Sequence, residues 1–120
     1  MQRDMNLVRK ILLALETSAH GHAPLGMEIE GYSEEQIGYH VHVLGQAKLL
    51  TVEVTTGWGS QSPKAIPTSI TWEGHEFLDS ARDETIWSKA MKKAGDVGGP
   101  LSLTVLKSVL DSLLKGQLGL

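Results

Sequence analysis

The pattern that most restricts the fold is a β-hairpin directly after an amphipathic helix. Residues 51–56 (T-V-E-V-T-T) alternate and are rich in β-branched side chains, which is typical of a strand. Residues 57–64 (G-W-G-S-Q-S-P-K) are rich in turn formers, and residues 65–71 are predicted to be the returning strand. Pro67 confines that strand to a sheet edge. The size of this hairpin is that of a wing.

Two helices are predicted before the hairpin. The first spans residues 4–18, with Asp4 as its cap. The second runs to Ala47 and begins at Ser33, which has Gln36 three residues later in the spacing of a capping box. Each helix carries apolar residues at helical spacing: Leu7, Val8, Ile11, Leu12 and Leu15 in the first, and Ile37, Val41 and Leu44 in the second.

A brief strand is predicted between these helices, over residues 25–32. Met27 and Ile29 alternate there with Glu28 and Glu30, as in a half-buried strand.

Helices are also predicted after the hairpin. Thr71 caps the next helix, which either continues or restarts near Asp83. Residues 95–100 (G-D-V-G-G-P) predict a flexible break. A last amphipathic helix is expected over residues 102–115, with a stripe of aliphatic side chains and with Gly116 as its stop.

The order helix, short strand, helix, hairpin, helix predicts an α+β fold of the winged helix-turn-helix type, with a two-stranded wing and an extra C-terminal helix. No separate helix is evident directly before Ser33, between the predicted short strand and the second helix. Residues 1–95 are expected to form the winged-helix part. Residues 96–120 are expected to supply a linker and the C-terminal helix of the same single domain.

Several stretches carry a resemblance to a known group of proteins: R-D-M-N-L-V-R-K-I-L, G-Y-S-E-E-Q-I-G-Y-H-V-H-V-L, T-W-E-G-H-E-F-L-D and R-D-E-T-I-W. Together they resemble a family of small uncharacterised winged-helix proteins associated with phages and prophages. The resemblance implies the fold and a mobile-element setting, and it implies no activity. Many winged helices have glycine where this chain has Lys48, because glycine relieves a left-handed backbone.

Composition limits the class of protein. The 120 residues are 41% hydrophobic and 21% charged, which is ordinary for a globular domain. No cysteine is present, so disulfides and thiolate metal sites are excluded. No apolar run is long enough to cross a bilayer, and the first residues lack the pattern of a secretory signal. We therefore expect a cytoplasmic protein without membrane contact.

Catalytic, metal and cofactor sites are not predicted. His40 and His42 lie about 200° apart around one helix, so they do not share an ion. His75 and Glu76, with other acids nearby, lie on one amphipathic helix, where a solvated face explains them better than acid–base chemistry. The expectation is a protein that is not an enzyme.

Nucleic-acid binding is the first functional hypothesis, and it rests on the fold type. The residues expected to contact double-stranded DNA, or another partner, lie on the second helix and the wing: Gln36, Tyr39, His42, Gln46, Lys48, Trp58 and Lys64. Trp58 is expected to be exposed at the wing tip.

Charge argues against that hypothesis. The net charge is −3, and Glu34 and Glu35 occupy the first turn of the helix that would enter the groove. The alternative is an accessory factor that binds and modulates a host or phage protein, for example in counter-defence. A basic stripe beside the wing would favour DNA, and an acidic or apolar face would favour protein. The apolar stripe of the last helix also predicts a homodimer.

Overall fold

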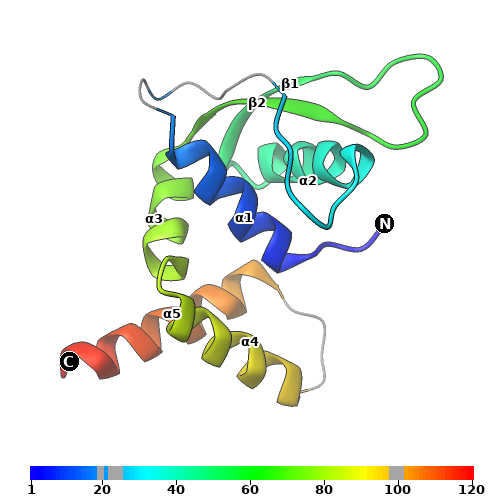
Figure 1. Cartoon of the computed structure of the whole chain (residues 1–120). Helices are drawn as coiled ribbons and strands as arrows, with labels where there is room; N and C mark the ends of the chain where they lie inside the picture. The colour runs from blue at the N-terminus through cyan, green and yellow to red at the C-terminus, as the bar shows by residue number, and fades with distance from the viewer. Residues whose placement is uncertain (19–20, 22–25, 98–101) are drawn as a thin grey trace. The chain divides into compact units, whose positions relative to one another are not determined.

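The computed structural model describes residues 1–18, 21, 26–97 and 102–120 (Figure 1). A two-stranded antiparallel sheet follows the second helix, and the chain forms two compact units, residues 1–75 and 76–120. The elements are α1 (Met5–Glu16), α2 (Glu34–Gln46), β1 (Leu50–Val54), β2 (Ala65–Ile70), α3 (Trp72–Ala81), α4 (Glu84–Val97) and α5 (Leu103–Leu118). This is an α+β, winged-helix-like arrangement, as the sequence predicts.

Helix α1 begins as its sequence predicts. The Asp4 side chain accepts a hydrogen bond from the backbone N–H of Leu7 at 3.1 Å, which satisfies one of the free donors of the first turn. The predicted apolar face is buried, with Leu7, Ile11 and Leu12 wholly shielded from solvent. The helix ends at Glu16, two residues before the predicted end.

His40 of α2 fixes the start of the chain to the second helix. Its Nε2 accepts a hydrogen bond from the Asp4 N–H at 2.9 Å, and its Nδ1 lies 2.8 Å from the Gln36 carbonyl oxygen. Because a carbonyl only accepts, the hydrogen-bond pattern assigns the neutral tautomer with hydrogen on Nδ1. The residue is 2% exposed, so this histidine is part of the core.

Tyr32 holds the segment before α2 against α1. Its hydroxyl donates to the Asp4 carboxylate at 3.1 Å, and the Lys10 ammonium lies 5.4 Å from the centre of its ring. Burial, the hydrogen bond to Asp4 and the charge of that carboxylate raise the pKa of the Tyr32 hydroxyl. Residues 26–32 are thereby tied down at their C-terminal end.

Helix α2 lies very close to the hairpin because glycines face it. A Cβ at Gly45 would lie 2.6 Å from a methyl carbon of Val52 in β1, and one at Gly38 would lie 3.1 Å from the Cβ of Lys64. At its start, Ser33 and Gln36 form the predicted capping box. The hairpin therefore packs on one side of α2, while Ile37, Val41 and Leu44 are buried on another.

The turn after α2 uses a left-handed residue that is not glycine. Lys48 has φ of +65°. Its N–H donates to the Gly45 carbonyl, and the N–H of Leu49 donates to the Leu44 carbonyl, which is the Schellman arrangement. The Lys48 carbonyl accepts from the Thr71 hydroxyl at 2.6 Å. Lysine thus occupies the conformation for which many winged helices use glycine.

The start of α3 is pressed against the end of that turn. Thr71 caps the helix as predicted, its hydroxyl oxygen accepting the Gly74 N–H at 3.0 Å. Gly74 is buried, and a Cβ added to it would lie on the carbonyl oxygen of Leu49. Only glycine fits this approach without movement of the backbone.

In the second unit, buried and half-buried polar side chains join α3 to α5. The Asp111 carboxylate of α5 accepts hydrogen bonds from the Ser80 hydroxyl at 2.6 Å and from the Lys107 ammonium at 2.8 Å. Burial alone would raise the pKa of the Asp111 carboxyl. The two hydrogen bonds and the charges of Lys107 and Lys115 outweigh burial, so the pKa lies below its usual range. Phe77 and Trp87 pack edge to face, with ring centres 6.5 Å apart.

Three further predictions along the chain are wrong. Residues 26–32 form no strand, although Met27 and Ile29 are half-buried and Glu28 and Glu30 exposed as the alternation indicates; residue 25 lies outside the described residues. Helix α4 continues through Gly95 to Val97, so the predicted break does not begin at residue 95; residues 98–100 are not described. Helix α5 passes Gly116 and ends at Leu118, and the next residue, Gly119, provides the left-handed stop with φ of +76°. The chain does restart a helix after Asp83, whose side chain accepts the Ile86 N–H.

Candidate partner-binding groove and the outer face of helix α2

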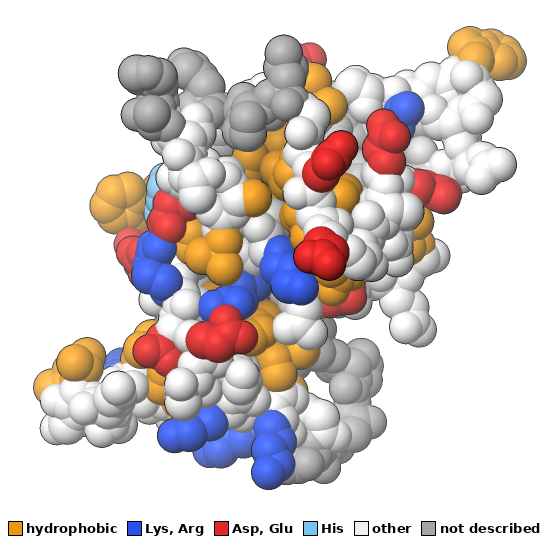
Figure 2. Space-filling view, viewed as in Figure 1, with side chains coloured by type: hydrophobic (Ala, Val, Ile, Leu, Met, Phe, Trp, Pro, Cys, Tyr) orange, Lys and Arg blue, Asp and Glu red, His pale blue; other side chains and the backbone are white. Residues whose placement is uncertain are grey.

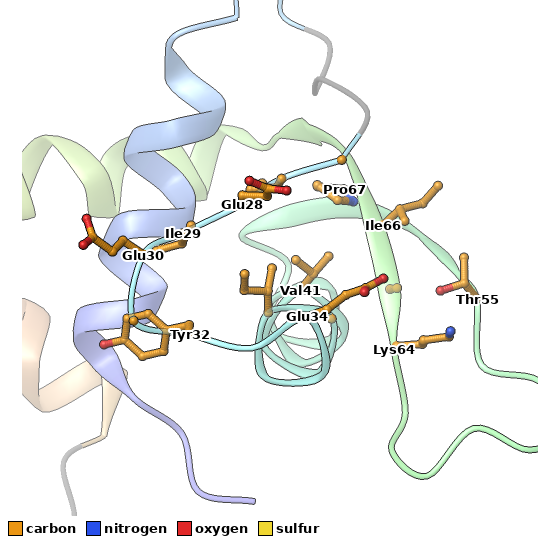
Figure 3. Close-up of a pocket in the computed structure, with 16 residues that line it drawn as sticks. Glu28, Ile29, Glu30, Tyr32, Glu34, Val41, Thr55, Lys64, Ile66 and Pro67 are labelled. Atoms are coloured by element: carbon orange, nitrogen blue, oxygen red, sulfur yellow. The ribbon is translucent and has the colours of Figure 1, made fainter.

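An open groove lies in the first unit between the segment before α2, the first half of α2 and β2. Its volume is about 1020 Å³. Figure 3 shows the segment carrying Glu28 and Ile29 on one side of α2, and Ile66 and Pro67 of β2 on the other. Most of the side chains that line it are apolar: Met27, Ile29, Ile37, Val41, Ala65, Ile66 and Pro67. Ile66 is 47% exposed at the rim, so the groove offers accessible apolar surface.

Acidic side chains border this apolar surface. Glu28 and Glu34 line the groove, and neither carboxylate has an ion-pair or hydrogen-bond partner among residues 1–18, 21, 26–97 and 102–120. Glu30 also lines it, but its carboxylate points away from α2 (Figure 3). Figure 2 shows hydrophobic side chains exposed between acidic ones on this part of the molecule. The groove therefore combines an apolar surface with unneutralised negative charge.

Lys64 is the cation that lines the groove. It is exposed at the end of the wing loop, and its backbone pairs with Thr55 and Thr56. The same loop is tied to α2 by a 2.6 Å hydrogen bond from the Ser62 hydroxyl to the Glu35 carboxylate. The bond engages Glu35, and it leaves the carboxylates of Glu28, Glu30 and Glu34 and the ammonium of Lys64 as the charges that line the groove.

The predicted contact residues of α2 lie together on its outer face, away from Ile37. Gln36 and Gln46 are exposed, and Tyr39 and His42 are half-buried. The side-chain amide oxygen Oε1 of Gln36 is already engaged in the capping box, where it accepts the Ser33 N–H at 2.8 Å.

Two other predicted contacts lie apart from both features. Trp58 is fully exposed at the tip of the hairpin, which confirms the predicted exposure. Lys48 is exposed in the turn after α2. Of the predicted set, the structure therefore brings only Lys64 to the groove.

His42 is the one unusual polar group of this region within the described part of the chain. Its Nδ1 is buried and has no hydrogen-bond partner there. No group of three or more histidine or acidic side chains is placed to hold a metal ion in those same residues. Nor does any helix among them have the length and apolar character to span a membrane.

The main residues of the groove were not predicted as a site. Ile66 is distant in sequence from Glu28 and Glu34, and the alternation around Glu28 predicts a strand rather than the wall of a groove. A usable signal was the run of glutamates, Glu28, Glu30 and Glu34, just before the apolar face of the second helix.

Comparison with known proteins identifies the family. A family model described as hypothetical protein (DUF2513) matches residues 2–100. The chain belongs to the DUF2513 family. The match includes α1, α2, the hairpin, α3 and α4, and thus every residue of the groove.

A relative of this DUF2513 chain occurs in Haemophilus influenzae. The chain is similar to an uncharacterized protein of that bacterium, with 29% identity over 119 residues, or 98% of this chain and 99% of the relative. No solved structure matches the chain. Neither description mentions a phage, a winged helix or DNA. Family membership therefore shows that these chains are related, and a function has to be inferred from the residues of the site.

Proposed function

We propose that this DUF2513 protein is a non-enzymatic, cytoplasmic binding module that captures a partner protein in the groove between residues 26–34, α2 and β2. The resemblance noted in its sequence implies a phage or prophage setting. There it would modulate a host or phage protein. The observation that carries the proposal is the accessible apolar surface bordered by the free carboxylates of Glu28 and Glu34.

The physical argument is that exposed apolar surface gains free energy when another protein covers it. Burial yields about 25 cal/mol for each Å² removed from water. Apolar patches with a polar border are typical of protein-binding sites. Duplex DNA offers the groove a row of phosphates, which free carboxylates repel. The acidic and apolar character of this face therefore favours a protein partner.

The basic charge that DNA binding requires is also missing from the relevant part of the sequence. No lysine or arginine occurs between Lys10 and Lys48, a stretch that includes all of α2. Glu34 and Glu35 occupy the first turn of α2, where they stabilise the helix through its dipole.

A pull-down with matched variants tests the proposal. Ile66 lines the groove, whereas Val54 of β1 is an exposed aliphatic residue of the same hairpin that does not line it. We expect wild-type protein and the Val54→Ser variant to retain a host or phage protein after nuclease treatment. The Ile66→Ser variant should lose most of it. Equal retention by both variants, or capture that nuclease abolishes, would contradict the proposal.

Sequence-specific DNA binding is the second candidate function. The observation in its favour is that Gln36, Tyr39, His42 and Gln46 share the outer face of α2 in a winged-helix-like fold. It predicts gel shifts that weaken steeply with salt and that weaken further in a Lys64→Glu variant. Absence of any shift at low salt, with random and phage-derived duplexes, would eliminate it.

A further inference from the structure

The loop between β1 and β2 presents a large aromatic side chain to solvent. Figure 1 shows this loop, residues 55–64, extending beyond the rest of the first unit. Trp58 at its tip is 107% exposed, so no described residue shields the ring. Tryptophan is among the residues that contribute most to binding when a partner covers them.

The turn that carries Trp58 is held by its own hydrogen bonds. The Ser60 N–H donates to the Gly57 carbonyl at 3.0 Å, and the Gly57 N–H donates to the Ser60 hydroxyl oxygen at 3.0 Å. Gly59 has φ of +85°, the positive value that a type II turn requires at its third residue. The backbone around Trp58 is therefore already ordered, and a partner does not have to order it on binding.

The returning side of the loop is fixed to the fold and reaches the groove. The Lys64 N–H donates to the Thr56 hydroxyl oxygen at 2.9 Å. The Ser62 hydroxyl donates to the Glu35 carboxylate of α2 at 2.6 Å. Since Lys64 also lines the groove, the loop that carries Trp58 is continuous with the surface to which we assign partner binding.

The lack of charge at the tip determines which class of partner it fits. Residues 54–63 contain no lysine, arginine, aspartate or glutamate. Contacts to nucleic-acid phosphates are made largely by basic side chains, and the tip has none to offer. One tryptophan among glycine, serine and glutamine also gives little apolar area for binding to a membrane surface. A pocket of another protein can cover the ring without any charge on the tip.

The indole N–H adds a polar requirement to such a pocket. Indole nitrogen Nε1 is a donor only, and at 107% exposure the group is hydrated in the free protein. Because a buried tryptophan N–H usually finds an acceptor, the pocket has to replace that water with an oxygen atom.

We propose that Trp58 is an anchor that enters an apolar pocket of the same partner protein that occupies the groove, where an oxygen atom of the pocket accepts the indole N–H. This inference rests on the proposed function. It adds a second point of contact, and it assigns Trp58 to a protein partner where the sequence left DNA open.

Calorimetric titration of the full chain tests the proposal, with the protein retained in the nuclease-treated pull-down as the probe. Trp58→Ala should bind this protein at least about thirtyfold more weakly than wild type. Trp58→Phe keeps a ring and loses the N–H, and it should bind about fivefold more weakly. Trp72→Ala is the matched control, because Trp72 is 76% exposed at the start of α3 and lies outside the loop and the groove. Its affinity should stay within about twofold of wild type.

A Gly59→Ala variant tests the fixed turn without removal of the anchor. A Cβ at Gly59 meets no atom within 4 Å, but its positive φ is strained for alanine. We expect binding about threefold weaker, because the turn loses its preferred conformation. Unchanged affinity would overturn the role given to the turn. Thermal melts of the Trp58 variants should coincide with wild type, since the ring is fully exposed.

The outcomes separate this inference from the proposed function. Equal affinity of wild type and Trp58→Ala, with binding lost in Ile66→Ser, would overturn the anchor while the proposed function stands. If wild type retains no protein after nuclease treatment, both are overturned. Binding to duplex DNA or to anionic lipid vesicles that is lost in Trp58→Ala would also overturn the assignment to a protein pocket.

Discussion

Replacement of Lys48 by glycine is expected to stabilise the protein. Lys48 holds φ of +65°, a conformation that costs an L-residue roughly 1–2 kcal/mol and costs glycine almost nothing. Glycine also lowers the free energy of unfolding by about 0.4–1 kcal/mol, because it enlarges the conformational freedom of the unfolded chain. The hydrogen bonds of the turn use backbone groups, and the Lys48 side chain is exposed, so neither is lost. The net gain should be about 0.5–1 kcal/mol in the free energy of unfolding.

Urea denaturation and thermal melting measure this gain. The midpoint temperature of Lys48→Gly should rise by about 2–5 °C. Lys48→Ala is the matched control, because it removes the same charge and side-chain length yet keeps an L-residue at the left-handed position. It should stay within about 0.5 kcal/mol of wild type. If the glycine and alanine variants are equally stable, or the glycine variant is less stable, the explanation of this turn is incorrect.

Three further perturbations test the packing. Gly74→Ala should lower the free energy of unfolding by about 1–3 kcal/mol, because the new Cβ meets the backbone. Gly95→Ala, in open space within α4, should raise the free energy of unfolding by about 0.5–1 kcal/mol. Reversed signs in urea titrations would refute this. Because the folded-state pKa of Asp111 is lowered, its carboxylate stabilises the fold above about pH 4, and that contribution is lost as the pH falls through the folded value. The Asp111→Asn variant should therefore be less stable at pH 7 by roughly 1 kcal/mol, discounted for its exposure, and should approach wild type in acid; a gap constant with pH would contradict this. The exposed aliphatic side chains of α5 predict a dimer by light scattering at micromolar concentration, and a monomer mass would refute it. A dimer that survives deletion of residues 100–120 would place the interface elsewhere.

Local chemistry explains why the helix starts were predictable. Capping depends on a residue and its neighbours within one turn, so Asp4, Ser33 and Thr71 could be identified from spacing alone. Helix ends at glycine were less predictable. Gly116 and Gly119 are both suitable residues, and only the backbone angle shows that the second is the left-handed stop.

The strand expected over residues 25–32 shows a different limit of prediction from the sequence. Alternation predicts which side chains face inward, and Met27 and Ile29 are indeed more buried than Glu28 and Glu30. A strand also needs a neighbour to share hydrogen bonds, and the sequence does not say whether β2 lies close enough. The groove exists because residues 26–32 and β2 are not paired, so its discovery required the structure.

The central claim is that the groove of this DUF2513 protein contacts a protein rather than DNA. The most direct measurement places a photo-crosslinking amino acid at Ile66, at Val54 or at Gln46 of the full chain, in cells that naturally carry the protein. We expect irradiation to give an adduct from position 66 that resists nuclease and is destroyed by protease, with little adduct from position 54. A nuclease-sensitive adduct from position 46 and none from position 66 would contradict the account and favour DNA binding through α2.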